Sequence, residues 1–425
     1  MAPLKRPKPT TVVLGLLCVM YLITYVDRVN VSTAIPAIRR ELALSDIQVG
    51  FLLSVFGYPY LVFQIFGGWI GDRFGPRRTL FLCGLVWAGA TILTGVAGGL
   101  TSLVLCRLLV GIGEGATFPV ATRAMQDWTP VGRRGFAQGL THAFARLGNA
   151  ITPPIVAWLV VAFQWRGSFV ALGVCSLVWV MVWVWYFRDV PAEHPAMTRA
   201  ELETLPNHGA AAKIVRPRVP WRPLTRRMAP VTVVYFCYGW TLWLYLTWIP
   251  SYLFNEYKFD LKKSALLTSA VYLPGVLGDF LGGELSDRIL HRTGDLQKAR
   301  RNVVMFGFLG SFVCMVPVFL THDLLPIILS LGAALFFAEI VIGPMWSIPM
   351  DIAGKFSGTA AGMMNTGSAL AAILSPIAFG YIIGKTGNWQ LPFAGSLGFL
   401  LLGAMLAPTM HPERSFDEAA AQVNG

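Results

Sequence analysis

The heptapeptide GGWIGDR at residues 67–73 returns as GGELSDR at residues 282–288, and this repeat indicates the fold. Both copies have the form Gly-Gly-x-x-x-Asp-Arg, and basic residues follow each of them. The 215 residues that separate Asp72 from Asp287 are about half of the 425-residue chain. Each copy comes at the end of a long apolar stretch. The spacing therefore predicts two structurally related halves.

Composition places most of the protein surface against something other than water. Hydrophobic residues make up 55% of the sequence and charged residues only 13%, with a mean hydropathy of +0.59. Soluble domains carry about 25% charged residues, which they need for a hydrated surface. The composition therefore excludes an ordinary cytosolic enzyme, a disordered chain and a disulfide-rich secreted domain.

Apolar stretches long enough to cross a bilayer occur twelve times. A membrane-spanning helix needs about 20 mostly apolar residues. We therefore expect an all-α integral membrane protein with twelve transmembrane helices in two pseudo-symmetric six-helix bundles, at 1–187 and 230–409. A charged cytoplasmic loop at 188–229 joins the bundles, and a cytoplasmic tail follows at 410–425. Repeated halves are a signature of secondary transporters, which place the substrate between the halves near the membrane midplane. The twelve spans lie near residues 12–38, 48–70, 79–99, 101–124, 137–162, 167–187, 230–254, 264–285, 302–321, 324–349, 357–384 and 390–409.

The excess of positive charge indicates the orientation of the chain. The sequence has 34 Lys and Arg against 22 Asp and Glu, a net charge of +12. With the N-terminus in the cytoplasm, 24 of these cations fall on the cytoplasmic side and 7 on the other, while Arg28, Arg107 and Arg146 fall inside spans. This asymmetry follows the positive-inside rule with both termini in the cytoplasm. We expect a multi-pass protein of a bacterial inner (plasma) membrane that binds the lipid bilayer and no nucleic acid.

Two motifs resemble those of the major facilitator superfamily. The residues from Gly68 to Arg78 match its loop motif between the second and third helices, and Arg107-x-x-x-Gly111-x-Gly113 matches its second motif. Within the superfamily the chain resembles the anion:cation symporters. These include bacterial galactonate, hexuronate and glucarate transporters and the vesicular carriers of glutamate and sialic acid. The narrower match rests on Tyr25-x-Asp27-Arg28-x-Asn30, Arg107-(x)6-Glu114, Gly343-Pro344-x-Trp346, Gly358-Thr359 and Asn365.

Seven ionisable side chains fall inside the predicted spans. Each costs about 2.5–3.5 kcal/mol at the bilayer centre even on the mildest scale, so such residues normally face the bundle interior or an aqueous cavity. They are the candidates for a transport site: Asp27, Arg28, Arg107, Glu114, Arg146, Asp279 and Glu339.

Arg107 and Glu114 are seven residues apart, which places them on one face of a helix about 10 Å from each other. An arginine fork suits a carboxylate. Burial disfavours the charged form of a glutamate, so that it can take up and release a proton. The alternative is a structural ion pair. The resemblance implies that Arg107 contacts substrate or serves in gating and that Glu114 couples transport to protons.

The adjacent Asp27 and Arg28 diverge by about 100° on a helix and cannot face each other. The resemblance implies a second proton site at Asp27, with a polar clasp between helices as the alternative. It also implies that Arg28 lines the pocket, with snorkelling as the alternative. Arg146 favours a substrate with more than one negative or strongly polar group, whereas the resembled galactonate transporters carry a neutral polar residue here. His142, one turn away, either titrates or packs as a hydrogen-bonded ring.

Aromatic and amide side chains at a similar depth suit a sugar-like or aromatic acid. Many aromatic residues of membrane proteins belong instead to interface belts. The candidates are Tyr25, Tyr60, Trp248, Trp346 and Asn365. Glu339 either couples protons or pairs with an arginine across the bundle, and Asp279 is expected to pack structurally.

The repeated Asp-Arg dipeptides fall at cytoplasmic helix ends and have a different interpretation. Ion pairs between the halves at these positions would hold one conformation closed and break in the other. The alternative is that they only anchor the topology. The gating candidates are Asp72, Arg73, Asp287 and Arg288.

Motifs for other chemistry are absent from the sequence. It contains no GxxxxGK[ST], HExxH or GxSxG, and its six cysteines are widely spaced, so we expect no enzyme, no cofactor and no metal site. We interpret the chain as a monomeric secondary transporter that imports an organic anion, a sugar acid or related carboxylate, by proton symport through alternating access. Alternatives within the same fold are an exporter, a sodium-coupled carrier, and a transporter of aromatic or dicarboxylic acids. The buried arginines disfavour a drug:proton exporter, and the repeated loop motif disfavours a channel or receptor.

Overall fold

The computed structural model describes residues 7–44, 46–206, 219–258 and 261–415, and in these ranges all regular secondary structure is helical. Parts of the expected central loop and tail, at 207–218 and 416–425, lie outside the described residues. The all-α prediction is confirmed.

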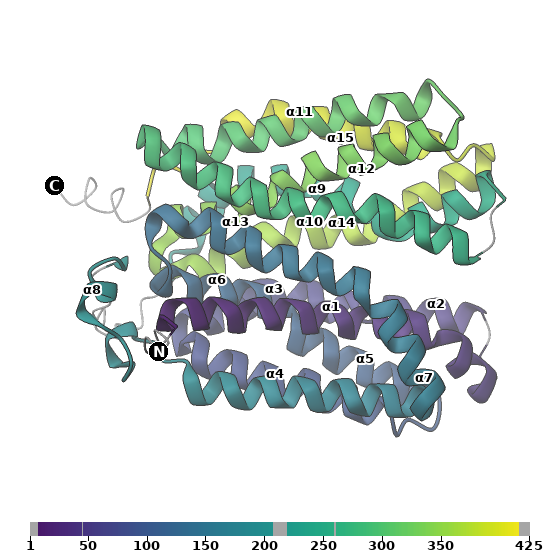
Figure 1. The fold of residues 1–425 in the computed structure, drawn as a ribbon, viewed down its shortest axis with the longest axis horizontal. Helices are drawn as coiled ribbons and strands as arrows, with labels where there is room; N and C mark the ends of the chain where they lie inside the picture. Colours follow the sequence, from purple (N-terminus) through teal and green to yellow (C-terminus); the bar gives the residue numbers. More distant parts are fainter. Residues whose placement is uncertain (1–6, 45, 207–218, 259–260, 416–425) are drawn as a thin grey trace, which may run out of the picture.

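The helices form two groups, which Figure 1 shows as a lower and an upper layer. The lower layer holds α1 (Pro9–Leu42), α2 (Asp46–Ser54), α3 (Gly57–Phe74), α4 (Pro76–Thr94), α5 (Leu100–Gly115), α6 (Thr117–Trp128), η1 (Val131–Arg133) and α7 (Arg134–Tyr186). The upper layer holds α9 (Trp221–Glu256), α10 (Leu261–Thr293), η4 (Gln297–Asn302), α11 (Val303–Met315), η5 (Val316–Phe319), α12 (Leu324–Ile340), α13 (Ile342–Ala353), η6 (Gly354–Phe356), α14 (Ser357–Thr386), α15 (Leu391–Leu406) and η7 (Ala407–Thr409). The chain segment that connects the two layers forms η2 (Pro191–Glu193) and α8 (Arg199–Leu202), at the end of the molecule where both termini lie (Figure 1).

Twelve helical segments of the described chain are long enough to cross a bilayer when consecutive short helices are taken together. Three predicted spans are each built from two helices, α2–α3, α5–α6 and α12–α13. Conversely, α7 contains two predicted spans, because the chain turns at Gln164, whose φ of 59° and ψ of 171° are not helical. Six such segments therefore lie in each layer of the described chain.

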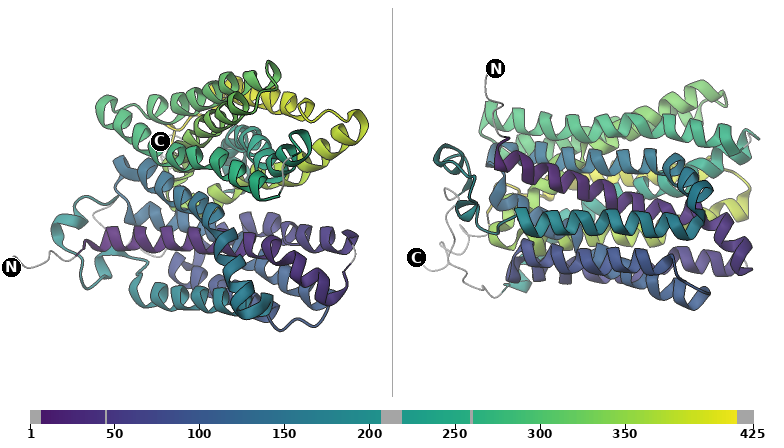
Figure 2. Two further views of the ribbon diagram at one scale, coloured as in Figure 1. Left: turned by 45° about the vertical axis from the view of Figure 1, so that its right-hand side comes forward. Right: turned by 60° about the horizontal axis from the view of Figure 1, so that its bottom comes forward.

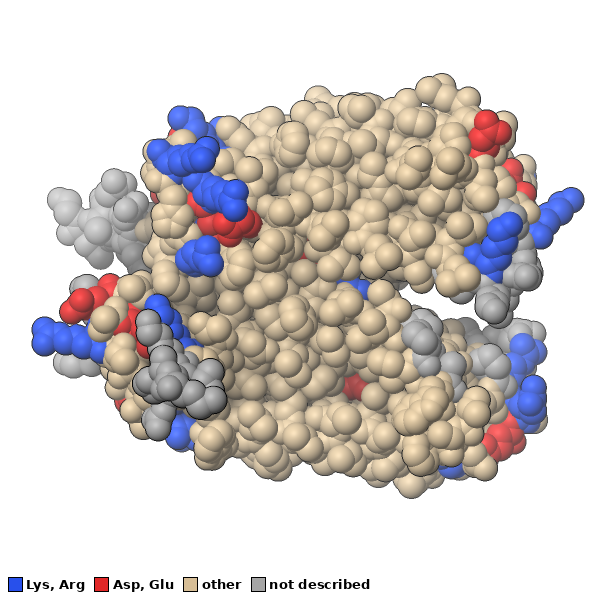
Figure 3. Space-filling model, in the orientation of Figure 1, with Lys and Arg blue, Asp and Glu red and all other residues tan. Residues whose placement is uncertain are grey.

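The outer surface of the protein is apolar between two charged ends. Figure 3 shows Lys, Arg, Asp and Glu gathered at both ends of the molecule, with a broad band of other residues between them. Large apolar side chains point outward, with exposed fractions of 73% for Trp185 and 68% for Met405. Apolar surface of this extent is unfavourable in water and matches the hydrocarbon of a bilayer.

The residues of the loop motif explain the turn between α3 and α4. Gly75 has a φ of 87°, a left-handed conformation that favours glycine, and it turns the chain between α3 and α4. Pro76 then begins α4, at a position where its missing N–H leaves no hydrogen bond unmade. The carboxylate of Asp189 accepts a hydrogen bond from the backbone N–H of Arg77 at 2.8 Å and so caps this helix.

The first glycine of each repeated motif packs helices together within one layer. A Cβ added at Gly67 would overlap Ala116, which links α5 to α6. A Cβ added at Gly282 would overlap the backbone of Ile340 at the end of α12. The two positions are therefore equivalent in the two halves.

The second glycine of each motif brings the two layers into contact. A Cβ added at Gly68 would overlap the carbonyl group of Gly358, and one added at Gly283 would overlap that of Gly135. The repeat thus packs α3 against the beginning of α14 and α10 against the beginning of α7. Figure 2 shows the two layers close together on the side of the termini.

Replacement of the second glycine should weaken this contact. In a Gly283→Ala protein the new methyl group meets the Gly135 backbone, and overpacking of this kind costs about 1–3 kcal/mol, or about tenfold in population. Arg133 and Glu284 form an ion pair of 3.5 Å across the same interface. We expect cysteines placed at these two positions, in a background without the native cysteines, to cross-link about tenfold more slowly in the variant.

Gly89→Ala is the matched control for this experiment, because nothing lies within 4 Å of an added Cβ at that position. Equal cross-linking rates in Gly283→Ala, Gly89→Ala and the unsubstituted protein would contradict the close contact of the layers.

Candidate transport site

A cavity of about 870 Å³ lies between the two layers. Its wall comes from α1–α3, α6 and α7 on one side and from α9, α10, α13 and α14 on the other. Figure 3 shows the molecule hollowed between the layers at the end opposite the termini. Among the described residues, this wall includes two arginines and no Asp or Glu. Its polar and aromatic residues include Tyr25, Arg28, Tyr60, His142, Arg146, Asn149, Tyr235, Trp346, Asn365 and Ser368.

Arg28 projects from α1 into this wall and is held on several sides. Its Nε donates a hydrogen bond to Oε2 of Glu114, a fully buried residue of α5, at 2.6 Å. Its guanidinium carbon lies 4.7–5.1 Å from the ring centroids of Tyr25, Tyr60 and Phe118. The aromatic faces attract the cation at this distance, and the carboxylate orients it. Arg28 therefore presents a positioned positive charge to the cavity, with Glu114 directly behind it.

Arg107 lies outside the described cavity wall in this conformation, and the expectation that it contacts substrate or serves in gating stays a prediction. It is buried on α5 with its guanidinium carbon 4.9 Å from the ring centroid of Phe56, and it does not belong to the described wall. Although Arg107 shares a helix with Glu114, two turns separate them by about 10 Å. Arg28 reaches the Glu114 carboxylate from a neighbouring helix instead.

Asp27 also lies behind the wall. Its buried carboxylate accepts a hydrogen bond from Ser176 Oγ at 3.3 Å, which links α1 to the second half of α7. This contact is the polar clasp that the sequence left open as an alternative. Inside the lower layer, two acids and two arginines therefore form one buried group: Asp27, Arg28, Arg107 and Glu114.

Arg146 joins the two layers across the cavity wall. Its Nη2 lies 3.1 Å from Oε2 of Glu339 on α12 and donates a hydrogen bond to the hydroxyl group of Tyr238 on α9 at 3.0 Å. Its Nε lies 3.7 Å from Oδ2 of Asp279 on α10. Both acids are fully buried. Glu339 thus pairs with an arginine across the bundle, one of its two expected roles. Asp279, expected only to pack, brings a second carboxylate to the same guanidinium group.

Three of the four aromatic candidates line the cavity: Tyr25, Tyr60 and Trp346. The indole Nε1 of Trp346 donates a hydrogen bond to the hydroxyl group of Tyr235 at 2.7 Å, which orients both rings. Trp248 lies away from the described wall and packs against Trp389 with ring centroids 5.9 Å apart. Trp248 lies about 100° around α9 from its wall-lining neighbour Thr247, so the expectation that it contacts substrate stays a prediction that this conformation does not support.

Asn365 connects the two layers inside the cavity. Its Nδ2 donates a hydrogen bond to Oε1 of Gln64, from α14 to α3, at 2.9 Å. The sequence analysis missed Gln64, although a single glutamine within an apolar span was a usable signal. His142 also lines the cavity, and its Nδ1 lies 2.9 Å from the carbonyl oxygen of Gln138. This is the hydrogen-bonded ring expected as one of its two alternatives.

The end of the molecule that holds the termini is closed by the repeated aspartates. Asp72 accepts hydrogen bonds from the backbone N–H groups of Gly358 and Thr359 at 2.9 and 2.6 Å, where α14 begins. Asp287 accepts them from Gly135 and Phe136 at 3.0 and 2.6 Å, where α7 begins. A helix N-terminus has unpaired N–H groups and a partial positive charge, so it binds a carboxylate well. Each aspartate thus joins its own half to the other.

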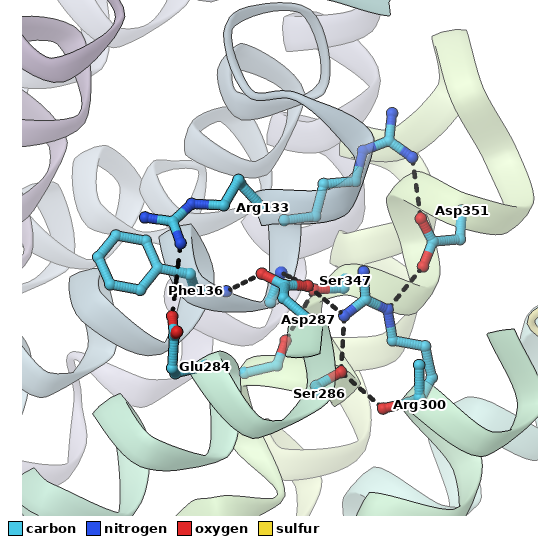
Figure 4. Close-up of polar contacts among 12 residues, drawn as sticks. Arg133, Phe136, Glu284, Ser286, Asp287, Arg300, Ser347 and Asp351 are labelled. Atoms are coloured by element: carbon cyan, nitrogen blue, oxygen red, sulfur yellow. Dashed lines mark hydrogen bonds and ion pairs between the residues drawn. The ribbon is translucent and has the colours of Figure 1, made fainter. Parts of the chain in front are cut away.

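Figure 4 shows that ion pairs extend this contact around Asp287. Arg300 donates hydrogen bonds to Asp287 at 2.9 Å and to Asp351 at 3.0 Å, and Asp351 in turn pairs with Arg134 of the other half at 2.9 Å. Sequence analysis did not single out Asp351, Arg134 or Arg300 as contacts between the halves. Arg300 had a signal, its place among the basic residues that follow the second motif, but charge clusters at helix ends also serve topology.

The expected role of the motif arginines is corrected. Arg288 pairs within its own helix with Glu284 at 2.9 Å, and the guanidinium carbon of Arg73 lies 5.5 Å from the ring of Trp69 on its own helix. Neither makes the predicted ion pair between the halves in this conformation, because both point outward from the helix face that carries the aspartate. In each Asp-Arg dipeptide, the aspartate rather than the arginine contacts the opposite half.

A cavity between two similar bundles, closed at one end by paired contacts, defines a secondary transporter of the alternating-access kind. Residues 17–376 match the family model described as Major Facilitator Superfamily, and the chain belongs to this superfamily. It is 48% identical, over 99% of its length and 98% of the relative's, to the probable sulfoacetate transporter of Cupriavidus necator. It is 29% identical to the probable galactarate/D-glucarate transporter of Escherichia coli, with 95% and 92% covered, and 30% identical to the hexuronate transporter of Bacillus subtilis, with 90% and 89% covered.

Solved structures show the same fold. The proton:xylose symporter XylE superposes with a TM-score of 0.79 at 14% identity, covering 97% of this chain and 98% of that one. The fucose:proton symporter FucP of Escherichia coli gives a TM-score of 0.72 at 13% identity, with 95% and 100% covered. The predicted family and its organic-anion branch are therefore confirmed, and the protein is a multi-pass membrane transporter rather than an enzyme.

Removal of one motif carboxylate should open the closed end. Asp72→Asn replaces charge-assisted hydrogen bonds, worth about 1.5–3 kcal/mol each, with neutral ones worth about 0.5–1.5 kcal/mol. We expect spin labels at two exposed positions of opposite halves, Arg73→Cys and Lys355→Cys, to populate longer distances in this variant. The measurement is double electron–electron resonance on the purified protein.

Glu203→Gln is the control for the Asp72 variant. Glu203 is exposed and pairs with Arg199 one turn away in the segment that connects the layers, so its loss should leave the distances unchanged. The same distribution in all three proteins would show that Asp72 does not hold the halves together.

Proposed function

We propose that the protein imports a small organic anion together with protons. The observation that supports this most is the cavity wall, where Arg28 and Arg146 face the open space and the described residues include no acid. Both guanidinium groups are held in position by protein partners before any ligand arrives. A preorganised arginine fork binds carboxylate, sulfonate or phosphate oxygens with directed hydrogen bonds. A cationic substrate would be repelled by both.

The substrate anion and Glu114 compete for the same guanidinium group in this proposal. When a substrate carboxylate binds Arg28, Glu114 loses its 2.6 Å partner while remaining buried. A buried carboxylate without a partner is strongly disfavoured, so Glu114 takes up a proton. Binding of the anion and binding of a proton are thereby coupled. Asp27, in the same buried group, is proposed as a second proton site, and Arg107 as the charge that balances it.

Transport would proceed by alternating access between the bundles at 1–187 and 230–409. The structure is open at the end opposite the termini. We assign that end to the outside of a bacterial inner (plasma) membrane, because most of the cations lie toward the other end. Closure over the substrate and release of the contacts at Asp72 and Asp287 would then open the cytoplasmic side. We propose that one chain performs this cycle as a monomer.

The two arginines favour a substrate with two anionic groups. Sulfoacetate carries a sulfonate and a carboxylate, and a relative with 48% identity is named a probable sulfoacetate transporter. A sugar acid is the second candidate, favoured by the amide and hydroxyl groups of Asn149, Asn365 and Tyr25 on the wall. Aromatic or dicarboxylic acids as substrates, export instead of import, and coupling to sodium instead of protons are the alternatives within the same fold.

Counterflow in proteoliposomes tests the proposed substrate class. With unlabelled sulfoacetate inside, we expect labelled sulfoacetate to accumulate transiently in the protein-containing vesicles. Arg28→Gln and Arg146→Gln should each lower the initial rate by at least about tenfold, because each removes a charge-assisted hydrogen bond worth about 1.5–3 kcal/mol.

Arg199→Gln, an exposed arginine of the segment that connects the layers, is the control for these variants. Acceleration by glucarate or galactonate but not by sulfoacetate would favour the sugar-acid candidate. A preference for neutral or cationic solutes would contradict anion transport altogether.

Coupling to protons is tested by Glu114→Gln. An amide cannot exchange a proton, so we expect the number of protons taken up with each substrate to fall by about one in this variant, while substrate exchange without a gradient continues. Wild-type uptake should rise as the outside becomes more acidic at constant sodium concentration. Glu41→Gln is the matched control, since Glu41 pairs with Arg166 at the open end, away from the cavity wall. An unchanged proton-to-substrate ratio in Glu114→Gln would contradict the coupling role.

A further inference from the structure

Two acids in the upper layer share one arginine, and they form a second charge cluster at the cavity. We call Asp279 and Glu339 the carboxyl pair. Both residues are fully buried, on α10 and α12, and both face Arg146, at 3.7 and 3.1 Å. Both carboxyl groups therefore reach the same guanidinium group. A hydrogen bond between the two carboxyl groups would need a proton on one of them.

The charges around the carboxyl pair do not balance. In the lower layer two arginines face two acids, so that group is neutral when all four are ionised. At the carboxyl pair one arginine faces two acids, and full ionisation would leave one buried negative charge. The other ionisable side chains that face this cluster supply no second permanent cation: Tyr25, His142, Tyr235, Tyr238, Tyr245 and Tyr272.

The hydrogen bonds among the described residues also favour a proton on the carboxyl pair. Tyr238 and Arg146 donate to Oε2 of Glu339, while its Oε1 and both carboxyl oxygens of Asp279 accept no hydrogen bond. Buried carboxylate oxygens without donors are costly. One proton placed between the two acids supplies the missing donor and removes the surplus charge together.

The backbone of α10 places the two acids next to each other. An added Cβ at Gly275 or Gly278 would press on the Glu339 side chain, so these glycines make the space in which it lies. An added Cβ at Gly139 would overlap the backbone of Asp279, which brings α7 and Arg146 against α10. The carboxyl pair and its arginine are therefore built into a close three-helix contact.

We propose that Asp279 and Glu339 hold one proton between them in the empty outward-open protein, and that the second anionic group of the substrate replaces Glu339 at Arg146. The carboxyl pair, now without its cation, takes up one further proton. This inference rests on the proposed function and deepens it, because it assigns the second anionic group of the substrate a place and a proton of its own. The same exchange of partners then occurs twice. The substrate replaces Glu114 as the partner of Arg28, and it replaces Glu339 as the partner of Arg146.

Infrared spectroscopy of the substrate-free protein tests the resident proton. A protonated carboxyl group has a C=O stretching band separate from those of carboxylates, and deuterium shifts it. We expect Asp279→Asn and Glu339→Gln each to remove one such band at neutral pH, because the single remaining acid becomes the ionised partner of Arg146. Glu41→Gln should retain the band. Persistence of the full band in both variants would overturn the proposal, and either variant alone is informative if the other does not fold.

Proton uptake on substrate binding tests the exchange at Arg146. In weakly buffered solution, sulfoacetate binding to the wild-type protein should take up about two protons by linkage. Each single variant should still take up about two, since one acid suffices, whereas the Asp279→Asn/Glu339→Gln double variant should take up about one. An equal count in the wild type and the double variant would overturn the exchange. Failure of sulfoacetate to bind any of these proteins would refute the proposed substrate, while the infrared result still decides the carboxyl pair.

Discussion

The cost of an unpaired charge in a medium without water governs the architecture of this transporter. Around the cavity Arg107, Arg146 and four acids are buried and Arg28 is partly buried, and each arginine that reaches the cavity is held by an acid. Glu114 holds Arg28 within the lower layer, and Glu339 holds Arg146 from the upper layer. In the proposed mechanism a substrate anion displaces a carboxylate from its arginine, and the displaced carboxylate takes up a proton. The need to neutralise buried charge is the physical link that this proposal makes between substrate and proton.

The same cost of unpaired charge applies at the closed end, where the buried carboxylates are satisfied in a different way. Asp72 and Asp287 each receive two backbone N–H groups of the opposite half in addition to an arginine of their own half, Arg123 at 3.7 Å and Arg300 at 2.9 Å. Backbone donors stay within their helix, so these contacts form only when the helix N-terminus approaches closely, and the motif glycines at 68 and 283 permit that approach. The repeated motif therefore makes two equivalent contacts between the halves, one from the aspartate of each half. The ion pairs at Asp351 strengthen only one of them, so the closed end is symmetric in its backbone and asymmetric in its charges.

Much of this was predictable from the sequence, and the failures have one cause. Apolar length and the repeated motif predicted the fold, and the cost of burial selected Arg28, Glu114 and Arg146 as candidates near the cavity. Helical spacing, however, reports only which residues share a face of one helix. It placed Arg107 beside Glu114 but could not show that Arg28 of another helix reaches the carboxylate first. Helical spacing gave the depth of Trp248 in the membrane but not the direction in which its side chain points. Asp279 was taken for a packing residue, because its partner lies 133 positions away on another helix.

The account as a whole depends on where the two ends of the anion bind. The most direct measurement is an experimental structure of the protein with sulfoacetate bound in the outward-open state. We expect one anionic group within hydrogen-bonding distance of Arg28 and the other within that distance of Arg146, with Glu114 and Glu339 no longer bonded to these arginines. A bound anion that leaves both ion pairs intact, or that lies away from both guanidinium groups, would contradict the exchange on which the mechanism rests.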